Sequence, residues 1–242
     1  MKKSMQTKSI LTYVLQKILI KIFYFKTSIS QNPIDNSPTR KRQFETFNIN
    51  LRKKTNTRHE LHHRLRYHEI EKYINTYNLK RVLEMGSGRT TFIFNSIPGV
   101  QAISVEQDVN WKDIITPLLF ESGLSPDIRV FDVHEYKEGG KFVDLPDYDC
   151  DLFYIDGPAI ERIRKFDTFT GKEAHYDFET LFSRGVFPKV IMIEGRTDTA
   201  DAIIESNHAD KYRFYGEFSH SIERKRWLSA LRFQRHSIFI RK

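Results

Sequence analysis

Residues 81–88 read Arg-Val-Leu-Glu-Met-Gly-Ser-Gly, and this stretch decides how the rest of the chain is interpreted. A short apolar run that ends in a Gly-x-Gly turn is typical of a buried strand followed by a loop. Residues 90–96 follow the turn, and we expect them to form a helix that ends before a Pro-Gly pair. Gly86 and Gly88 would let backbone N–H groups approach a ligand without interference from a Cβ atom. The stretch therefore predicts a strand–turn–helix unit that binds a ligand at its turn.

Strand and helix patterns alternate along the chain on both sides of this unit. Seven apolar runs have the length and the flanking residues of strands, at 81–85, 102–106, 128–132, 151–156, 189–194, 212–218 and 237–241. Apolar residues at helical spacing occupy 59–79 and 111–122, whereas no long helical pattern separates the last two strands. Alternating strands and helices build a parallel sheet that is covered on both faces. We therefore predict an α/β fold with a doubly wound, mostly parallel seven-stranded sheet and an antiparallel C-terminal edge.

Each of the five parallel strands is predicted to end in a carboxylate. These residues are Glu84, Glu106, Asp132, Asp156 and Glu194. In an open parallel sheet, ligands bind beyond the carboxyl ends of the strands, at the point where the strand order reverses. A single carboxylate at such a place is as often simply the polar residue at which burial of the strand ends as it is a ligand-binding group. Glu106 lies 20 residues after Gly86, where a carboxylate can accept hydrogen bonds from both hydroxyls of an adenosine ribose. The pattern favours an adenosine-containing cofactor.

Three segments resemble the class I S-adenosylmethionine-dependent methyltransferases. They are 82–91, 104–108 and 151–158. The resemblance extends over residues 60–242 and implies a Rossmann-like fold. More narrowly, the chain is similar to small methyltransferases of bacterial polysaccharide and natural-product pathways and to the plant glucuronoxylan methyltransferases, which share a Glu-x-Gly-x-Gly turn and an Asp-Gly-Pro-like step. Thr90 replaces the usual third glycine, a change that methyltransferases tolerate better than dinucleotide dehydrogenases do.

The resemblance implies which residues hold the cofactor. They are Glu84, Gly86, Gly88, Glu106, Gln107 and Asp132. Among them, the glutamate and glycines of the turn would surround the methionine part of S-adenosylmethionine. Glu106 would hold the ribose, and Gln107 would lie beside the adenine. Asp132 would face the adenine amino group, with His134 or Glu135 as alternatives.

The resemblance also places Asp156 beside the transferred methyl group, which makes it the first candidate for a general base or a metal ligand. Glu194 ends the next strand, where metal-dependent O-methyltransferases have another acidic ligand. Two carboxylates on adjacent strand ends could hold Mg²⁺ or Ca²⁺, with water completing the coordination shell. Those families usually have Asp-Asn or Asp-Asp at this step, whereas this chain has Glu194 followed by glycine.

The segment between the fourth and fifth strands is a candidate wall of the acceptor site, or a surface loop and helix. It contains the run His175-Tyr176-Asp177. Three cations after the fourth strand could bind an acidic acceptor such as a uronic acid or a phosphate, or lie on a solvated helix face: Arg162, Arg164 and Lys165. Three histidines are alternative bases: His134, His220 and His236.

The charge and cysteine content narrow the class of protein. Cys150 is the single cysteine of 242 residues, which excludes an internal disulfide and a Cys-based zinc site and favours a reducing compartment such as the cytoplasm. The net charge is +8, but residues 1–66 hold 15 Lys and Arg against 3 Asp and Glu, whereas the remainder holds 24 against 28. A nucleic-acid-binding domain more often spreads positive charge over its folded body. No Asn-Pro-Pro-Tyr-like step follows the fourth strand either, so the sequence argues against a nucleic-acid partner.

Residues 9–25 are expected to form a basic amphipathic helix. Two lysines within these 17 residues argue against a membrane-spanning helix. The helix would pack on its own domain or a partner chain, or lie as a peripheral element in an anionic membrane surface. Residues 27–58 are interpreted as a linker. The predicted organisation is a basic helix and linker over 1–58 and a methyltransferase domain over 59–242.

The sequence therefore predicts an S-adenosylmethionine-dependent methyltransferase that methylates a hydroxyl of a saccharide or related small molecule. One alternative is an NAD-dependent nucleotide-sugar enzyme, against which Glu84, Thr90 and the absence of a Tyr-x-x-x-Lys pair count. The other alternative is a methyltransferase-like scaffold that binds a partner without catalysis.

Overall fold

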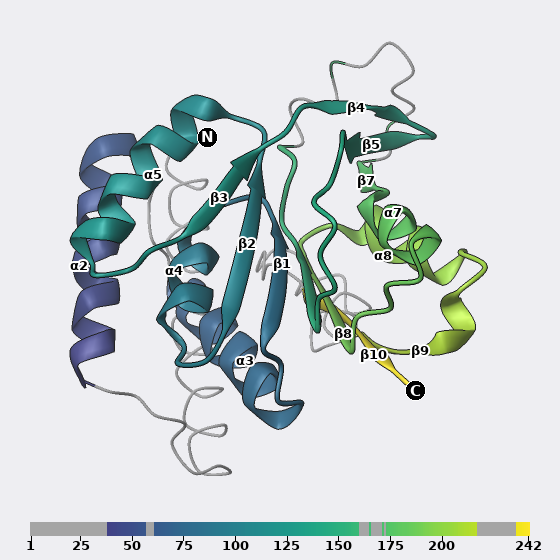
Figure 1. Ribbon diagram of the computed structural model, residues 1–242, viewed down its shortest axis with the longest axis horizontal. Helices are drawn as coiled ribbons and strands as arrows, with labels where there is room; N and C mark the ends of the chain where they lie inside the picture. Colours follow the sequence, from purple (N-terminus) through teal and green to yellow (C-terminus); the bar gives the residue numbers. More distant parts are fainter. Residues whose placement is uncertain (1–37, 57–60, 160–164, 166–170, 172, 217–235) are drawn as a thin grey trace, which may run out of the picture.

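The computed structural model of the protein describes residues 38–56, 61–159, 165, 171, 173–216 and 236–242 (Figure 1). Its main sheet has seven strands in the order β3-β2-β1-β6-β8-β10-β9. Their bounds are β1 Arg81–Met85, β2 Gln101–Glu106, β3 Asp127–Val130, β6 Leu152–Ile155, β8 Val190–Glu194, β9 Tyr212–Gly216 and β10 His236–Arg241. The first five in this spatial order are parallel, and β10 pairs antiparallel with both β8 and β9. The predicted doubly wound sheet with an antiparallel C-terminal edge is confirmed.

Helices cover both faces of this sheet (Figure 1). One face carries α2 Pro38–Thr55, α3 Leu61–Thr76, α4 Arg89–Ser96 and α5 Val109–Glu121, and the other carries α7 Asp177–Ser183 and α8 Thr197–Ile204. Val82 of β1 packs into the hydrophobic cluster of the first face and Leu83 into that of the second. The alternation follows from strand geometry, because successive side chains point to opposite faces. Strands buried on both faces read as continuous apolar runs, which is why their positions could be predicted.

Residues 38–55 form helix α2, so the linker interpretation is wrong for this stretch. Phe47 and Leu51 are buried at helical spacing on its inner face. The Phe47 ring packs on Phe92 of α4, with ring centroids 5.2 Å apart. α2 therefore shares a hydrophobic cluster with α3, α4 and α5, although it precedes the predicted boundary at residue 59. The helix expected at 9–25 lies outside the described residues.

A small three-stranded sheet, which the sequence patterns do not predict, lies beyond β3. Its strands are β4 Val133–Tyr136, β5 Gly139–Phe142 and β7 Ala174–His175, in the order β4-β5-β7. Because β3 ends at Val130 rather than at 132, Asp132 lies in the link between β3 and β4. The Asp132 carbonyl accepts a hydrogen bond from the Val143 N–H at 2.8 Å, which fixes this link to the end of β5.

Candidate functional site

The ends of β1 and β6 meet backbone to backbone at two glycines. Gly86 has a φ of +89°, and a Cβ atom there would lie 2.7 Å from the Gly157 nitrogen. Gly157 is equally confined, since its own Cβ would lie 2.6 Å from Gly86 Cα. The N–H groups of Asp156 and Gly157 both donate to the Met85 carbonyl, at 2.9 and 2.6 Å, and the Gly157–Pro158 peptide bond is cis. Only glycine fits at either position, so the two loops hold a fixed relation.

Behind this turn, the fully buried carboxylate of Glu84 is surrounded by hydroxyl groups. It accepts hydrogen bonds from Thr91 at 2.7 Å, from Ser104 at 2.5 Å and from Thr90. Burial raises the pKa of Glu84 to about 7; the three hydrogen bonds oppose this shift and the nearby Asp156 carboxylate adds to it. Because Thr90 and Thr91 lie in the first turn of α4, Glu84 joins the start of the helix to the end of β1. Thr90, which replaces the usual third glycine, thus has a structural role of its own.

The carboxylate of Glu106 lies against the same turn. Its Oε2 accepts from the N–H of Ser87 at 3.0 Å and from the Ser87 hydroxyl at 2.7 Å. Its Oε1 accepts from the N–H groups of Gln107 at 2.8 Å and Asp108 at 3.1 Å. The Ser87 carbonyl accepts in turn from the Trp111 indole N–H at 2.8 Å. A carboxylate has about four acceptor positions, so a ribose hydroxyl would replace the Ser87 hydroxyl, which can rotate away where a backbone N–H cannot.

Two features of this end of the sheet fit an adenosine cofactor. A Cβ atom on Gly88 would meet no described atom within 4 Å, so the turn presents its backbone there. The Oε1 atom of Gln107 is buried without a hydrogen-bond partner among the described residues, and an adenine amino group would supply one. Asp132 is exposed after β3, and the alternatives His134 and Glu135 lie in β4. The six predicted cofactor residues thus lie at the carboxyl ends of the neighbouring strands β1, β2 and β3, and their roles stay predictions.

Asp156 follows β6 and is half-buried at the same end of the sheet. Its backbone carbonyl accepts a hydrogen bond from the guanidinium of Arg196, which follows β8. His175 of β7 is fully buried, and this burial, supported by the charge of Arg196, lowers the pKa of His175 well below its ordinary value. The backbone N–H of His175 donates to the Thr199 hydroxyl of α8 at 2.9 Å. Arg196 therefore supports the backbone of Asp156 from the β8 side, and the buried His175 lies close enough for the charge of Arg196 to act on it.

The run from His175 to Asp177 is buried rather than part of a surface loop. Asp177 begins α7, and its Oδ1 accepts the Phe142 N–H at 2.8 Å. Burial raises the pKa of Asp177 to about 7. Lys165 is exposed. Two further cations predicted to bind an acidic acceptor, Arg162 and Arg164, and one alternative base, His220, lie outside the part of the chain that the structure describes.

Glu194 ends β8, but its carboxylate belongs to a separate polar cluster. It accepts a hydrogen bond from the Tyr154 hydroxyl, and its Oε2 lies 4.0 Å from Nε2 of His236. Nδ1 of His236 lies 2.5 Å from the Glu69 carboxylate of α3. Among the described residues, no group of three or more His, Cys, Asp and Glu side chains has the arrangement of a metal site. The predicted metal pair of Asp156 and Glu194 is therefore not supported.

Several side chains of the site were not singled out by the sequence motifs. They are Ser87, Thr91, Ser104 and Arg196. Ser104 could have been found, because a hydroxyl within the apolar run 102–106 needs a buried partner. Arg196 gives no such indication, since it contacts the Asp156 carbonyl 40 positions earlier in the chain.

Two solved structures share this fold at low sequence identity. A candidate caffeoyl-CoA O-methyltransferase from Staphylococcus aureus is 11% identical and aligns over 95% of this chain and 100% of its own, with a TM-score of 0.53. The methyltransferase PaMTH1 from Podospora anserina, solved with bound SAH, is 9% identical and aligns over 93% of this chain and 96% of its own, with a TM-score of 0.54. The sequence matches no protein-family model and no curated protein. The likeness shows that the chain has the Rossmann-like fold of these methyltransferases.

Proposed function

We propose that the protein is an S-adenosylmethionine-dependent O-methyltransferase that acts on a hydroxyl of a saccharide or related small molecule. The observation that carries the proposal is the turn between β1 and α4, fixed by the contact of Gly86 with Gly157. Beside it lie the half-buried Gly88, the carboxylate of Glu106 and the Oε1 atom of Gln107, which has no hydrogen-bond partner among the described residues. The two structural neighbours support the proposal, since both are described as methyltransferases and one was solved with SAH.

In this proposal, different residues of the site contact different parts of the cofactor. The backbone at Gly86 and Gly88 lies against the methionine part, behind which Glu84 holds the start of α4 in place. Glu106 accepts the ribose hydroxyls after the Ser87 hydroxyl has rotated away. Gln107 accepts a hydrogen bond from the adenine amino group, which satisfies its buried oxygen.

When bound, S-adenosylmethionine supplies a methyl group that its sulfonium already activates, so the protein mainly has to align the reacting atoms. The acceptor oxygen would take up this methyl group as the carbon–sulfur bond breaks, and the hydroxyl proton would pass to a base. We assign that base to the carboxylate of Asp156. Its backbone is fixed on both sides, since its N–H donates to Met85 and its carbonyl accepts from Arg196. A fixed backbone lets the carboxylate hold one orientation.

The saccharide as acceptor is supported by the narrower resemblance to polysaccharide methyltransferases. That resemblance rests on the Glu-x-Gly-x-Gly turn that begins at Glu84 and on the Asp-Gly-Pro step that begins at Asp156. The exposed Lys165, which follows this step, suits an acidic sugar such as a uronic acid.

Titration calorimetry with S-adenosylmethionine, its demethylated product and NAD tests the proposed cofactor. We expect the first two to bind and Glu106→Ala to abolish that binding. Glu121→Ala is the matched control, because it removes an exposed carboxylate at the end of α5. Asp156→Asn should bind the cofactor as the wild type does and lose methyl transfer. Binding of NAD alone would favour an oxidoreductase, and the absence of all three heats would favour a non-catalytic scaffold.

A further inference from the structure

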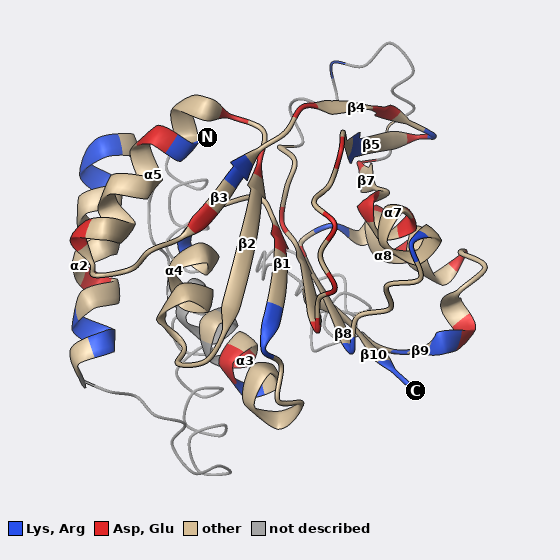
Figure 2. Ribbon diagram, in the orientation of Figure 1, with Lys and Arg blue, Asp and Glu red and all other residues tan. Residues whose placement is uncertain are grey.

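The outer face of α2 carries cations that the candidate site does not use. Five of them are exposed: Lys41, Arg42, Arg52, Lys53 and Lys54. Within the described part of the chain, none of their side chains forms an ion pair. Figure 2 shows Lys and Arg at both ends of α2, on the flank of the molecule away from the small sheet. The sequence of α2 holds six Lys and Arg against one acidic residue, Glu45, so the helix surface is strongly positive.

Helical spacing turns two of these cations, Arg42 and Lys53, away from the core. Arg42, Ile49 and Lys53 follow one another at intervals of seven and four residues, so they lie along one line of the helix, opposite the buried Phe47 and Leu51. At about 1.5 Å per residue, the two cations are about 16 Å apart. Ile49 between them is 56% exposed. The outward face is therefore basic at both ends, with the exposed Ile49 and Glu45 between them.

The charge and hydropathy of the neighbouring sequence fit the same surface. Residues 1–66 hold 15 Lys and Arg against 3 Asp and Glu, whereas the rest of the chain is acidic. The run 9–25, which precedes α2, combines Ile, Leu, Phe and Tyr with two lysines and no acidic residue. Attraction to anionic headgroups together with apolar insertion gives firmer membrane binding than either does alone. No helix of the described residues has the length and apolar character to cross a bilayer.

We propose that the outer face of α2, formed by Arg42, Ile49 and Lys53 with Lys41 and Arg52 beside them, docks the protein on anionic lipid headgroups. A nucleic acid fits this face less well, because an exposed isoleucine adds nothing to a phosphate contact. The acidic remainder of the chain would also repel a long polyanion. The docking face is independent of the proposed methyl transfer.

Sedimentation of the full chain with vesicles tests this docking. We expect binding to phosphatidylcholine vesicles that contain phosphatidylglycerol, weakened by salt, and no binding to phosphatidylcholine alone. Arg42→Gln with Lys53→Gln should lower the partition coefficient about 30-fold, at about 1 kcal/mol per cation. The matched control is Arg213→Gln with Lys242→Gln, which removes the same charge from exposed positions at the β9–β10 edge and should leave binding unchanged.

Three results would overturn the proposal. If the Arg42/Lys53 variant bound vesicles as the wild type does, residues before α2 would account for the binding. Equal losses in the α2 and control variants would mean that net charge alone is responsible. Tighter binding to duplex RNA than to vesicles, lost in the α2 variant, would assign the face to nucleic acid. Ile49→Ser sharpens the last comparison, since it should weaken binding to vesicles and leave binding to RNA unchanged.

Discussion

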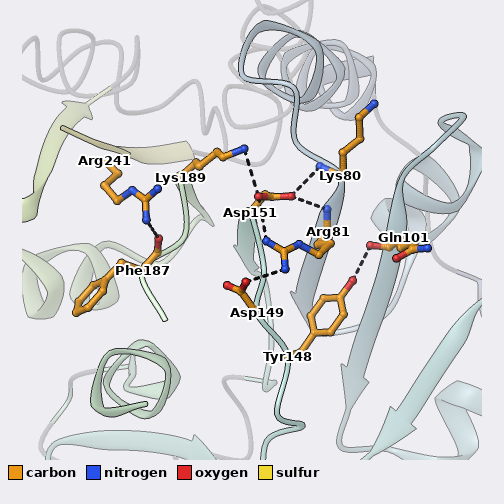
Figure 3. A network of polar contacts seen from close by, with 9 residues as sticks. All are labelled: Lys80, Arg81, Gln101, Tyr148, Asp149, Asp151, Phe187, Lys189 and Arg241. Carbon is orange, nitrogen blue, oxygen red and sulfur yellow. Dashed lines mark hydrogen bonds and ion pairs between the residues drawn. The ribbon is translucent and has the colours of Figure 1, made fainter. Parts of the chain in front are cut away.

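Two buried carboxylates show how differently this protein treats the two ends of its central strands. At the amino end, Asp151 precedes β6 and accepts the N–H groups of Lys80 at 3.1 Å and Arg81 at 3.0 Å. The Arg81 guanidinium at 3.5 Å and the Lys189 ammonium at 3.3 Å complete its surroundings (Figure 3). At the carboxyl end of β1, Glu84 accepts hydrogen bonds from hydroxyl groups instead. One acid is thus surrounded by positive charge and the other by neutral groups.

The difference appears in the pKa values. Burial by itself would raise the pKa of Asp151, but the hydrogen bonds from Lys80 and Arg81 and the charge of Lys189 together lower it below its ordinary value. At Glu84 burial prevails and the pKa rises to about 7, because the described groups that act on it are hydroxyls and the Asp156 carboxylate rather than cations. The amino end therefore uses its acid for stability. In the proposed function, the carboxyl end binds a cationic cofactor, and its buried acid, Glu84, is paired with hydroxyl groups instead of with cations of the protein.

The largest effect is expected where the carboxyl end depends on glycine. Gly86→Ala would strain a φ of +89° and place a Cβ atom 2.7 Å from the backbone of Gly157, which is itself confined. We expect a loss of about 3 kcal/mol or more in the free energy of unfolding, measured by denaturant, and no S-adenosylmethionine binding. Gly123→Ala is the control: its φ is +77°, but its Cβ would meet no described atom within 4 Å. It should cost about 1 kcal/mol and preserve binding. Equal losses in the two variants would contradict a role for the close approach.

The next largest effect is a pH dependence that Glu84 should confer on stability. The pKa of Glu84 rises from its ordinary value of 4.5 to about 7 in the fold, so folding favours the protonated acid. This stabilisation is fully present below pH 4.5 and is lost as the pH rises through about 7, a change of about 3 kcal/mol. Glu84→Gln stays neutral and should be more stable than the wild type on the alkaline side of this range. Denaturant unfolding at a series of pH values measures the difference in the free energy of unfolding between the wild type and Glu84→Gln. Asp177 makes a similar pH-dependent contribution, but it is present in both proteins and therefore cancels from this difference. Parallel profiles for the two proteins would show that Glu84 is not the titrating group.

The features of the carboxyl end also differ in how far they could be predicted from the sequence. The strand at 81–85 and the glycines that follow could be predicted, because a doubly covered strand reads as an apolar run and few residues suit the turn. The surroundings of Glu84 could not, since Ser104 lies 20 residues away on the next strand and Thr90 reads as an ordinary helix residue. The partners of a buried acid are set by strand order, which a local pattern does not contain.

The elements that the sequence failed to predict share a dependence on tertiary contacts. α2 packs through a short apolar stripe that includes Phe47 and Leu51, within a stretch where polar and charged residues together predominate. Its helix is stabilised by burial against α4 rather than by its own propensity. The strands β4, β5 and β7 have four, four and two residues, too few for a periodic pattern to emerge.

The smallest effect is expected at the amino end. Asp151→Asn keeps the shape of the side chain but removes the charge that Arg81 and Lys189 face, and it should cost about 2 kcal/mol at neutral pH. Because the folded pKa of Asp151 is lowered, this contribution is present above the ordinary value of 3.8 and is lost as the pH falls through the folded pKa. Denaturant unfolding of wild type and variant should therefore converge in acid.

Asp149→Asn is the matched control for that measurement. Asp149 pairs with the same Arg81 at 2.7 Å, but its side chain is 68% exposed, so its loss should change stability very little. S-adenosylmethionine should bind both variants as it binds the wild type, because their contacts lie at the end of the sheet opposite the glycine turn. Weaker binding of S-adenosylmethionine to Asp151→Asn would contradict the separation of roles between the two ends of the sheet. It would mean that the two ends are coupled along β6, which Asp151 precedes at one end and Asp156 follows at the other.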